Sequence, residues 1–169
     1  LNEYDFFHFN DKSFIALPWS ANLSGFYTAA TIQFIPGAEY HYLNSVSAKR
    51  FENISFTILP QSDRMGYRLK GESLVLQLPR EMISSAVTKG TIQLLPDGQL
   101  IILLADHQTS GGYPKIGHVI SSHIASLAQM RACEKIEFQQ TNLPDAEEQL
   151  LKKQRNLQLL QNACNFRLQ

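Results

Sequence analysis

The segment from Thr91 to Ala105, TIQLL-PDGQ-LIILLA, constrains the fold more than any other part of the sequence. Two runs rich in β-forming residues flank Pro96-Asp97-Gly98, where Pro fixes φ, Asp bonds the backbone and Gly accepts a positive φ. This pattern predicts a β-hairpin. The second arm, LIILLA, shows no polar alternation, so we expect both of its faces to be buried and the arm to lie centrally in the sheet.

Short apolar runs separated by turn residues continue along most of the chain, which is typical of strands. Short helices are predicted at residues 43–50 and 122–129, the second capped by Ser122. Further strands are predicted at residues 13–17, 31–35, 55–59, 67–69, 73–78, 116–121 and 135–140. A total of about eight to ten short strands indicates an all-β fold, either a closed barrel or a sandwich.

The C-terminal part of the chain has a different period. Leu143, Leu150 and Leu157 recur every seven residues, and Glu147 and Glu148 lie near the start, where a helix dipole favours acids. We predict an amphipathic helix over residues 145–163. It lies against the barrel or against a partner, and its own domain is the expected contact because such stripes usually serve the local core. The predicted organisation is a leader with an edge strand (1–29), a barrel domain (30–142), and the C-terminal helix and tail (143–169).

Charge and composition disfavour several classes of function. The 15 Lys and Arg residues balance the 15 Asp and Glu residues, so there is no net field to attract nucleic acid or an anionic membrane. No apolar run approaches the roughly 20 residues of a membrane span, and we expect no signal peptide. Cys133 and Cys164 lie far apart without a Cys-x-x-Cys pair, which indicates idle thiols in a reducing, cytoplasmic compartment.

Three polar segments interrupt the β pattern, at residues 60–68, 90–93 and 105–115. In the third, Gly111 and Gly112 would let backbone N–H groups approach a carboxylate or a developing oxyanion. The alternative is a plain turn between two strands in which Asp106 bonds loop amides, and physical reasoning alone favours that turn.

The other two segments carry further candidates. Asp63 and Arg64 are adjacent and would point to opposite faces of a strand, and the planar fork of Arg suits a carboxylate. A structural Asp–Arg pair is an equally good reading. Gln93 lies between apolar neighbours, so its amide points into a pocket or is satisfied inside the barrel. The histidines show no metal-ligand spacing, and no nucleophile elbow, Walker loop or dinucleotide fingerprint is present.

Three long blocks resemble the signature segments of one family: SDRMGYRL (62–69), GTIQLLPDGQ (90–99) and LLADHQTSGGYPKIGHVI (103–120). They look like those of the family that comprises the biotin-dependent carboxyltransferases, allophanate hydrolase subunit 2 and the C subunit of 5-oxoprolinase. The likeness runs from about residue 30 to 140 and corresponds to the C-terminal half of the family's members. One departure is that the usual Arg-Pro-Gly-Asp turn is replaced by Arg131-Ala132-Cys133-Glu134.

The resemblance implies a cyclophilin-like closed β-barrel with one or two short helices. It also implies a small amide substrate and a partner of the type of the family's B subunit or of allophanate hydrolase subunit 1. The implied cofactor is ATP, used through the complex, or carboxybiotin, with no covalently bound cofactor and no metal. Our main hypothesis is a subunit of an ATP-dependent 5-oxoprolinase-type complex. Alternatives are biotin-dependent carboxyl transfer to urea or a related amide, and a non-catalytic module that antagonises a kinase inhibitor.

Residue type suggests roles for the polar segments in such chemistry. Asp106 would orient or deprotonate the amide, Arg64 would bind a carboxylate and Gln93 would donate a hydrogen bond. We expect the polar segments to converge at one mouth of the barrel. The predicted substrate-binding residues are Ser62, Asp63, Gln108, Thr109, Gly111, Gly112, Tyr113 and Lys115.

Overall fold

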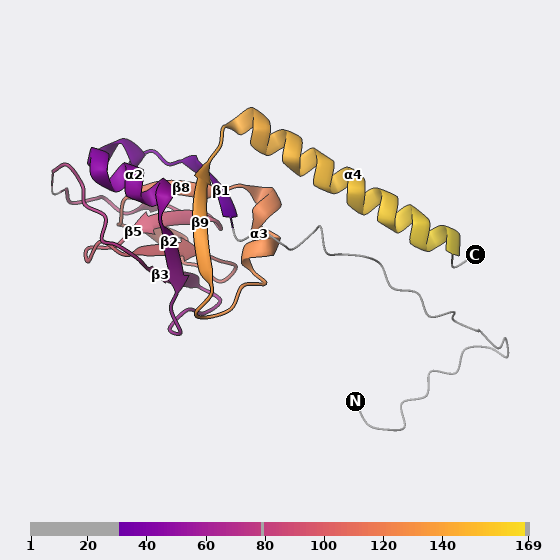
Figure 1. Cartoon of the computed structure of the whole chain (residues 1–169), viewed down its shortest axis with the longest axis horizontal. Coiled ribbons are helices and arrows are strands. Elements are labelled where there is room, and N and C mark those ends of the chain that lie inside the picture. Colours follow the sequence, from indigo (N-terminus) through magenta and orange to yellow (C-terminus); the bar gives the residue numbers. More distant parts are fainter. Residues whose placement is uncertain (1–30, 79, 168–169) are drawn as a thin grey trace, which may run out of the picture.

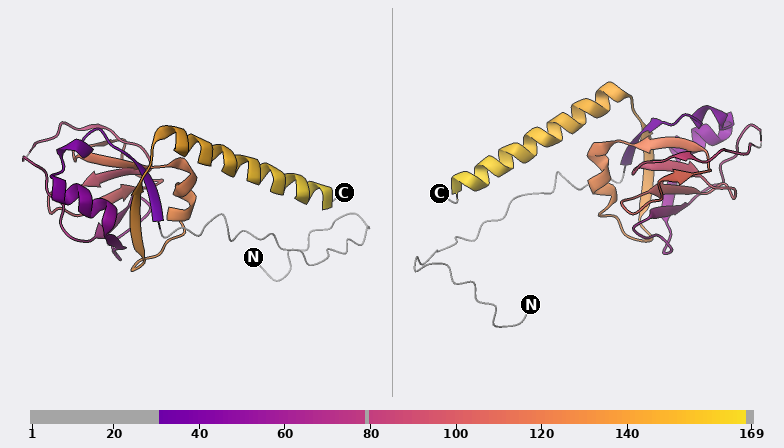
Figure 2. Two further views of the ribbon diagram at one scale, coloured as in Figure 1. Left: turned by 45° about the horizontal axis from the view of Figure 1, so that its top comes forward. Right: turned by 180° about the vertical axis from the view of Figure 1, so that it is seen from behind.

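The computed structural model describes residues 31–78 and 80–167 (Figures 1 and 2). Within these residues, seven strands close a barrel in the order β1-β8-β5-β6-β3-β2-β9. All neighbours are antiparallel except β1 and β9, which are parallel. The strands are β1 (Thr31–Pro36), β2 (Ser55–Ile58), β3 (Gly66–Lys70), β5 (Thr91–Leu94), β6 (Leu100–Leu103), β8 (Lys115–Val119) and β9 (Lys135–Gln140). The predicted closed barrel is confirmed, whereas the leader and the strand predicted at 13–17 lie outside the described residues.

Two short helices accompany the barrel, as predicted: α2 (Ser45–Asn53) and α3 (Ser121–Leu127). The 3-10 turn η1 (Tyr40–Tyr42) was not predicted. Asn44 caps α2, since its side chain accepts a hydrogen bond from the Ser47 amide at 2.7 Å. The predicted cap of α3 is wrong, because the helix begins at Ser121 with Ile120 at the N-cap and Ser122 lies inside it.

The predicted hairpin forms β5 and β6, with Ile92 opposite Ile102. Its turn has the expected chemistry: Gly98 has a φ of +79°, and the Asp97 carboxylate accepts the amide of Gln99 at 3.0 Å. Strand β6 pairs with β5 on one side and with β3 on the other, so the apolar arm is an inner strand of the barrel wall.

The centre of the core is a cluster of four phenylalanines. Phe51, on the inner face of α2, lies 4.7 Å from Phe34 of β1 and 4.6 Å from Phe138 of β9, measured between ring centroids. Phe56 of β2 lies 5.7 Å from Phe138. None of the four is more than 2% exposed. The cluster therefore joins α2 to three strands of the barrel.

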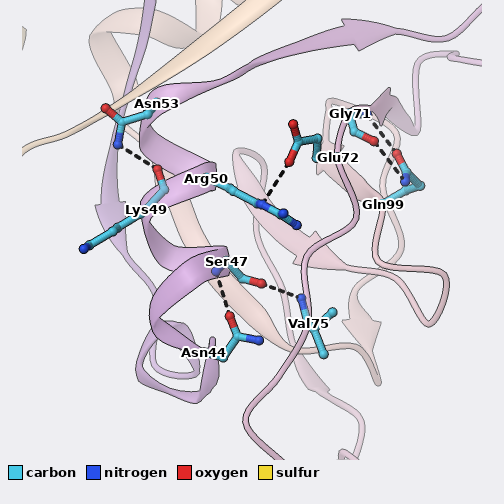
Figure 3. A network of polar contacts seen from close by, with 9 residues as sticks. All are labelled: Asn44, Ser47, Lys49, Arg50, Asn53, Gly71, Glu72, Val75 and Gln99. Atoms are coloured by element: carbon cyan, nitrogen blue, oxygen red, sulfur yellow. Dashed lines mark hydrogen bonds and ion pairs between the residues drawn. The ribbon is translucent and has the colours of Figure 1, made fainter.

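The strand predicted at residues 73–78 is wrong. This segment crosses the surface beside α2 (Figure 3), where Arg50 and Glu72 form an ion pair at 2.9 Å. Its amides are satisfied one at a time: Val75 N–H donates to the Ser47 hydroxyl at 2.8 Å and Leu74 N–H to the Gly98 carbonyl at 2.9 Å. Because every barrel strand already has two neighbours, no free edge is left for this segment to extend.

The C-terminal helix α4 (Leu143–Arg167) extends away from the barrel (Figures 1 and 2). Its first turns contact the domain, where Ala146 is buried and the Lys153 ammonium donates to the Ser122 carbonyl at 2.7 Å. Farther along, Leu157 is 47% exposed and Phe166 is 83% exposed. Docking on the domain therefore holds only for the first turns, because α3 has seven residues and cannot cover a helix of 25. No helix of the described residues is long and apolar enough to cross a membrane.

His123 connects α3 to β1 and to α4. Its Nδ1 accepts the backbone N–H of Gln33 at 3.1 Å, which requires that this nitrogen carry no proton. Burial lowers the pKa of His123 below its ordinary value of 6.5, and the positive charge of Lys153 lowers that pKa further. Hydrogen bonds with Gln149 and the Thr31 backbone oppose the shift without reversing it. The folded protein therefore favours the neutral ring.

Acid should weaken this junction. Because the unfolded state binds a proton on His123 more tightly, the stability from the neutral ring is complete above about pH 6.5 and is lost as the pH falls below it. His123→Asn keeps an acceptor for the Gln33 amide but does not titrate, so it should reduce the slope of unfolding free energy against pH. Some slope remains, because burial also lowers the pKa of His118. Urea unfolding at several pH values measures the slope, and an unchanged slope would contradict the role of His123.

Candidate functional site

A pocket of about 440 Å³ lies beside β3, β5 and β6 and is lined by residues from the stretches 61–68, 93–101 and 108–113. All three polar segments of the sequence therefore contribute to one cavity. The pocket mixes amide, carboxylate and guanidinium groups with apolar walls at Ile101 and Pro96. Such a lining suits a small polar ligand that has an apolar ring or edge.

Strand register places the pocket on the outer face of the barrel wall. Ile101 of β6 lies opposite Arg68 of β3 on one side and opposite Gln93 of β5 on the other. Their sequence neighbours Leu69 and Ile92 point into the core. Because side chains alternate along a strand, the three residues face away from the core. The expected position at a mouth of the barrel is therefore wrong.

Gln93 is the buried polar group of this pocket and has no exposed surface. Its Nε2 donates to the Tyr113 carbonyl at a long 3.4 Å, and its backbone neighbour Leu94 donates to the Pro114 carbonyl at 3.0 Å. Its Oε1 has no hydrogen-bond partner among the described residues. An unsatisfied buried acceptor costs about 1–3 kcal/mol, so this oxygen is the candidate acceptor of the site for a bound water or ligand.

Residues 106–114, which we call the covering loop, lie over Gln93. Gly111 belongs to the short strand β7 (Ser110–Gly111) and pairs with Ser85 of β4 (Ser85–Ala86). A Cβ added at Gly111 would lie 2.6 Å from Nε2 of Gln93. The Lys115 ammonium contacts the Ser85 hydroxyl, and Val87 N–H donates to the Thr109 carbonyl at 3.1 Å. The small sheet therefore holds the loop against the Gln93 amide.

Arg64 and Asp106 bind each other. The guanidinium makes two contacts with the carboxylate, at 3.0 Å and 3.2 Å, and the Asp106 amide donates to the Arg64 carbonyl at 3.0 Å. The two side chains are 83% and 47% exposed, and neither lines the pocket. An exposed ion pair contributes about 0–1 kcal/mol, so this pair can open at little cost.

The structure brings Asp63, Gln93, Gln108 and Tyr113 of the predicted site to the pocket lining. Asp63 also shapes its turn, since its Oδ1 accepts the amides of Met65 and Gly66 at 2.8 Å and 3.2 Å. The predicted residues outside the lining are Arg64, Asp106, Ser62, Thr109, Gly111, Gly112 and Lys115.

Sequence reasoning missed three polar lining residues, Gln61, Arg68 and Asp97. For Arg68 a signal was present, because it precedes the apolar Leu69 on a strand and so should face outward. Ser62 acts on this strand instead: its hydroxyl accepts the Arg68 amide at 3.0 Å. Within the described residues, no group of three or more His, Cys, Asp or Glu side chains could hold a metal ion.

Comparison with known proteins places these features in context. Residues 10–140 match the model of the carboxyltransferase domain family, subdomains A and B. The chain is 43% identical over 115 residues to the C subunit of the 5-oxoprolinase of Haemophilus influenzae and 38% identical over 115 residues to that of Escherichia coli. Each alignment covers 68% of this chain and 37% of the relative, so the chain spans little more than a third of these curated relatives.

Among solved structures, the fold is similar to part of the urea amidolyase of K. lactis. The TM-score is 0.65 at 18% identity, over 69% of this chain and 8% of that chain. At this identity the likeness concerns the fold alone. Helix α4 begins after the last residue of the family match, so it is an addition to the matched region.

Proposed function

The chain belongs to the carboxyltransferase domain family, subdomains A and B, and we propose that it is a subunit of an ATP-dependent 5-oxoprolinase-type complex. In this proposal it acts on a small cyclic amide together with a partner barrel subunit. Both curated relatives are named as the C subunit of a 5-oxoprolinase, which supports an assembly of several subunits. The remaining parts of the active complex would come from the other subunits and from the regions of the relatives that this chain does not span.

The observation that carries the proposal is the buried, unpartnered Oε1 of Gln93 in a pocket of about 440 Å³. A small amide supplies the N–H donor that this oxygen lacks. Gln108 and Tyr113 add further polar groups to the lining, and Ile101 offers an apolar wall for a ring. Oriented hydrogen bonds of this kind bind and polarise an amide without a protein nucleophile.

ATP does not fit this pocket. A triphosphate needs several cations or a row of backbone N–H groups. Arg68 is the cation of the lining, and the carboxylates of Asp63 and Asp97 lie in the same lining. The proposal therefore assigns ATP to another subunit and the amide to this chain.

Asp106 and Arg64 enter the proposal as a charged pair that opens when substrate binds. Because neither side chain lines the pocket, the opened pair would have to turn toward it. Asp106 would then orient or deprotonate the amide, and Arg64 would bind the substrate carboxylate. Asp106→Asn should lower kcat for 5-oxoproline by roughly 100-fold, a typical contribution of general acid–base catalysis. The unfolding free energy should change by no more than about 1 kcal/mol, because the pair is exposed.

The test is ATP-dependent turnover of 5-oxoproline by the assembled complex that contains this chain. Gln158→Asn is the control. It is a similarly conservative substitution on the exposed part of α4, away from the pocket, and should leave kcat unchanged. An unchanged kcat in Asp106→Asn would remove Asp106 from the mechanism. If the assembled complex fails to turn over 5-oxoproline but transfers a carboxyl group to urea, the proposed function is wrong.

A further inference from the structure

We propose that Gln93 selects ligands with an unsubstituted amide N–H, and that Gly111 is the positioning residue that holds Gln93 in this role. The inference rests on the proposed function, because it concerns the same pocket. It adds the atoms by which the ligand is recognised and the class of ligand that is rejected.

The orientation of the Gln93 amide defines what the pocket recognises. A side-chain amide has one acceptor end and one donor end. Nε2 faces the Tyr113 carbonyl, so turning the amide over would set its oxygen against another acceptor. Oε1 is thereby the end without a partner among the described residues, and in this inference it is the atom that accepts from the ligand. Residue type alone had suggested that Gln93 donates to the substrate.

Gly111 fixes the place of this amide as well as its orientation. A Cβ at position 111 would lie 2.6 Å from Nε2 and 3.4 Å from both Cδ and Oε1 of Gln93. Pairing with Ser85 holds the Gly111 backbone in place, so the Gln93 side chain has to yield instead. Gly111 is not one of the glycines with positive φ, so alanine fits its backbone and acts mainly through Gln93.

The ligand class follows from these contacts. A secondary amide, a lactam or urea offers an N–H to Oε1. An N-methylated relative of similar shape offers none and leaves the buried oxygen unsatisfied. The pocket adds acceptor oxygens at Asp63 and Gln108, which also favour ligands rich in N–H groups. The methylated compound is therefore rejected because it cannot make this hydrogen bond as well as because of its size.

The experiment measures Kd by calorimetry for two matched pairs of probes on the assembled complex. One pair is 5-oxoproline and N-methyl-5-oxoproline, and the other is urea and tetramethylurea. The wild type should prefer the N–H member of the pair that it binds by roughly 10- to 100-fold. Gln93→Leu should bring the preference close to one, and Gly111→Ala should reduce it severalfold. Gln158→Asn, on the exposed part of α4, should leave it unchanged.

The outcomes separate the inference from the function on which it rests. Equal binding of 5-oxoproline and its N-methyl derivative by the wild type overturns the inference but keeps the substrate. Binding only of urea, with tetramethylurea rejected, supports the inference and overturns the proposed substrate. If Gln93→Leu keeps the wild-type preference for the N–H probe, the role of Gln93 is wrong. If Gly111→Ala keeps that preference, the role of Gly111 is wrong. The ratio of two Kd values is insensitive to the folded fraction, so a destabilised variant still gives an answer.

Discussion

Phe51→Ala should lower the free energy of unfolding by about 3–5 kcal/mol, the usual cost of removing a buried phenylalanine. Phe51 has no exposed surface, and its ring contacts the rings of Phe34 and Phe138 at centroid distances of 4.7 Å and 4.6 Å. It is also the apolar anchor of α2, whose other buried residue is Ser47. Without it, α2 loses its main attachment to the barrel, and the contacts of Ser47 and Arg50 with residues 72–75 weaken as well.

Thermal and urea unfolding of the variant measure this effect. Small domains are stable by about 5–15 kcal/mol, so the loss should be a large part of the total and lower the Tm by roughly 10 °C or more. Phe166→Ala is the matched control, because Phe166 is 83% exposed at the end of α4 and should change stability little. Equal losses in the two variants would show that the four-ring cluster is not the centre of the core.

Local sequence patterns were sufficient where a structure is fixed by near neighbours. The hairpin of residues 91–105 forms as predicted, because Pro96-Asp97-Gly98 imposes the turn and the turn sets the register of its arms.

Local sequence patterns were insufficient where a segment's structure depends on which edges and surfaces distant segments leave free for it. Residues 73–78 have a strand-like composition, yet the closed barrel offers no edge to them. The stripe of α4 predicts a helix correctly but does not reveal that the domain surface ends after a few turns. In both cases the missing information was the position of a partner far away in the sequence.

The candidate site also combines features that local patterns predict with features that depend on distant segments. The three polar segments could be identified from the sequence, and residues from each of them line one pocket. Which side chains face it depends on the pairing of Arg68, Ile101 and Gln93 across three strands, and a shift of one residue would reverse every orientation. The missing partner of Gln93 Oε1 depends on the covering loop, whose path no local pattern determines.

Gly37→Ala should destabilise the barrel by about 3 kcal/mol or more, at the upper end of what overpacking costs. A Cβ at this position would lie 2.1 Å from the carbonyl oxygen of Lys115 and 2.9 Å from the backbone nitrogen of Gly117. These atoms belong to the backbone of β8, so no side-chain rotation relieves the contact. The β1–β8 connection has to move, and with it the bond from Gly37 N–H to the Ile116 carbonyl.

The same substitution should weaken ligand binding in the pocket, because Lys115 directly follows the covering loop and helps to anchor it. Displacing Lys115 disturbs its contact with Ser85 and the bond of its amide to the Glu39 carboxylate, and so loosens the loop over Gln93. We therefore expect a lower urea midpoint together with weaker binding of 5-oxoproline. Ala38→Ser, at the exposed next position, is the control and should alter neither. Wild-type stability of the Gly37→Ala protein would contradict the close approach of the Gly37 backbone to β8.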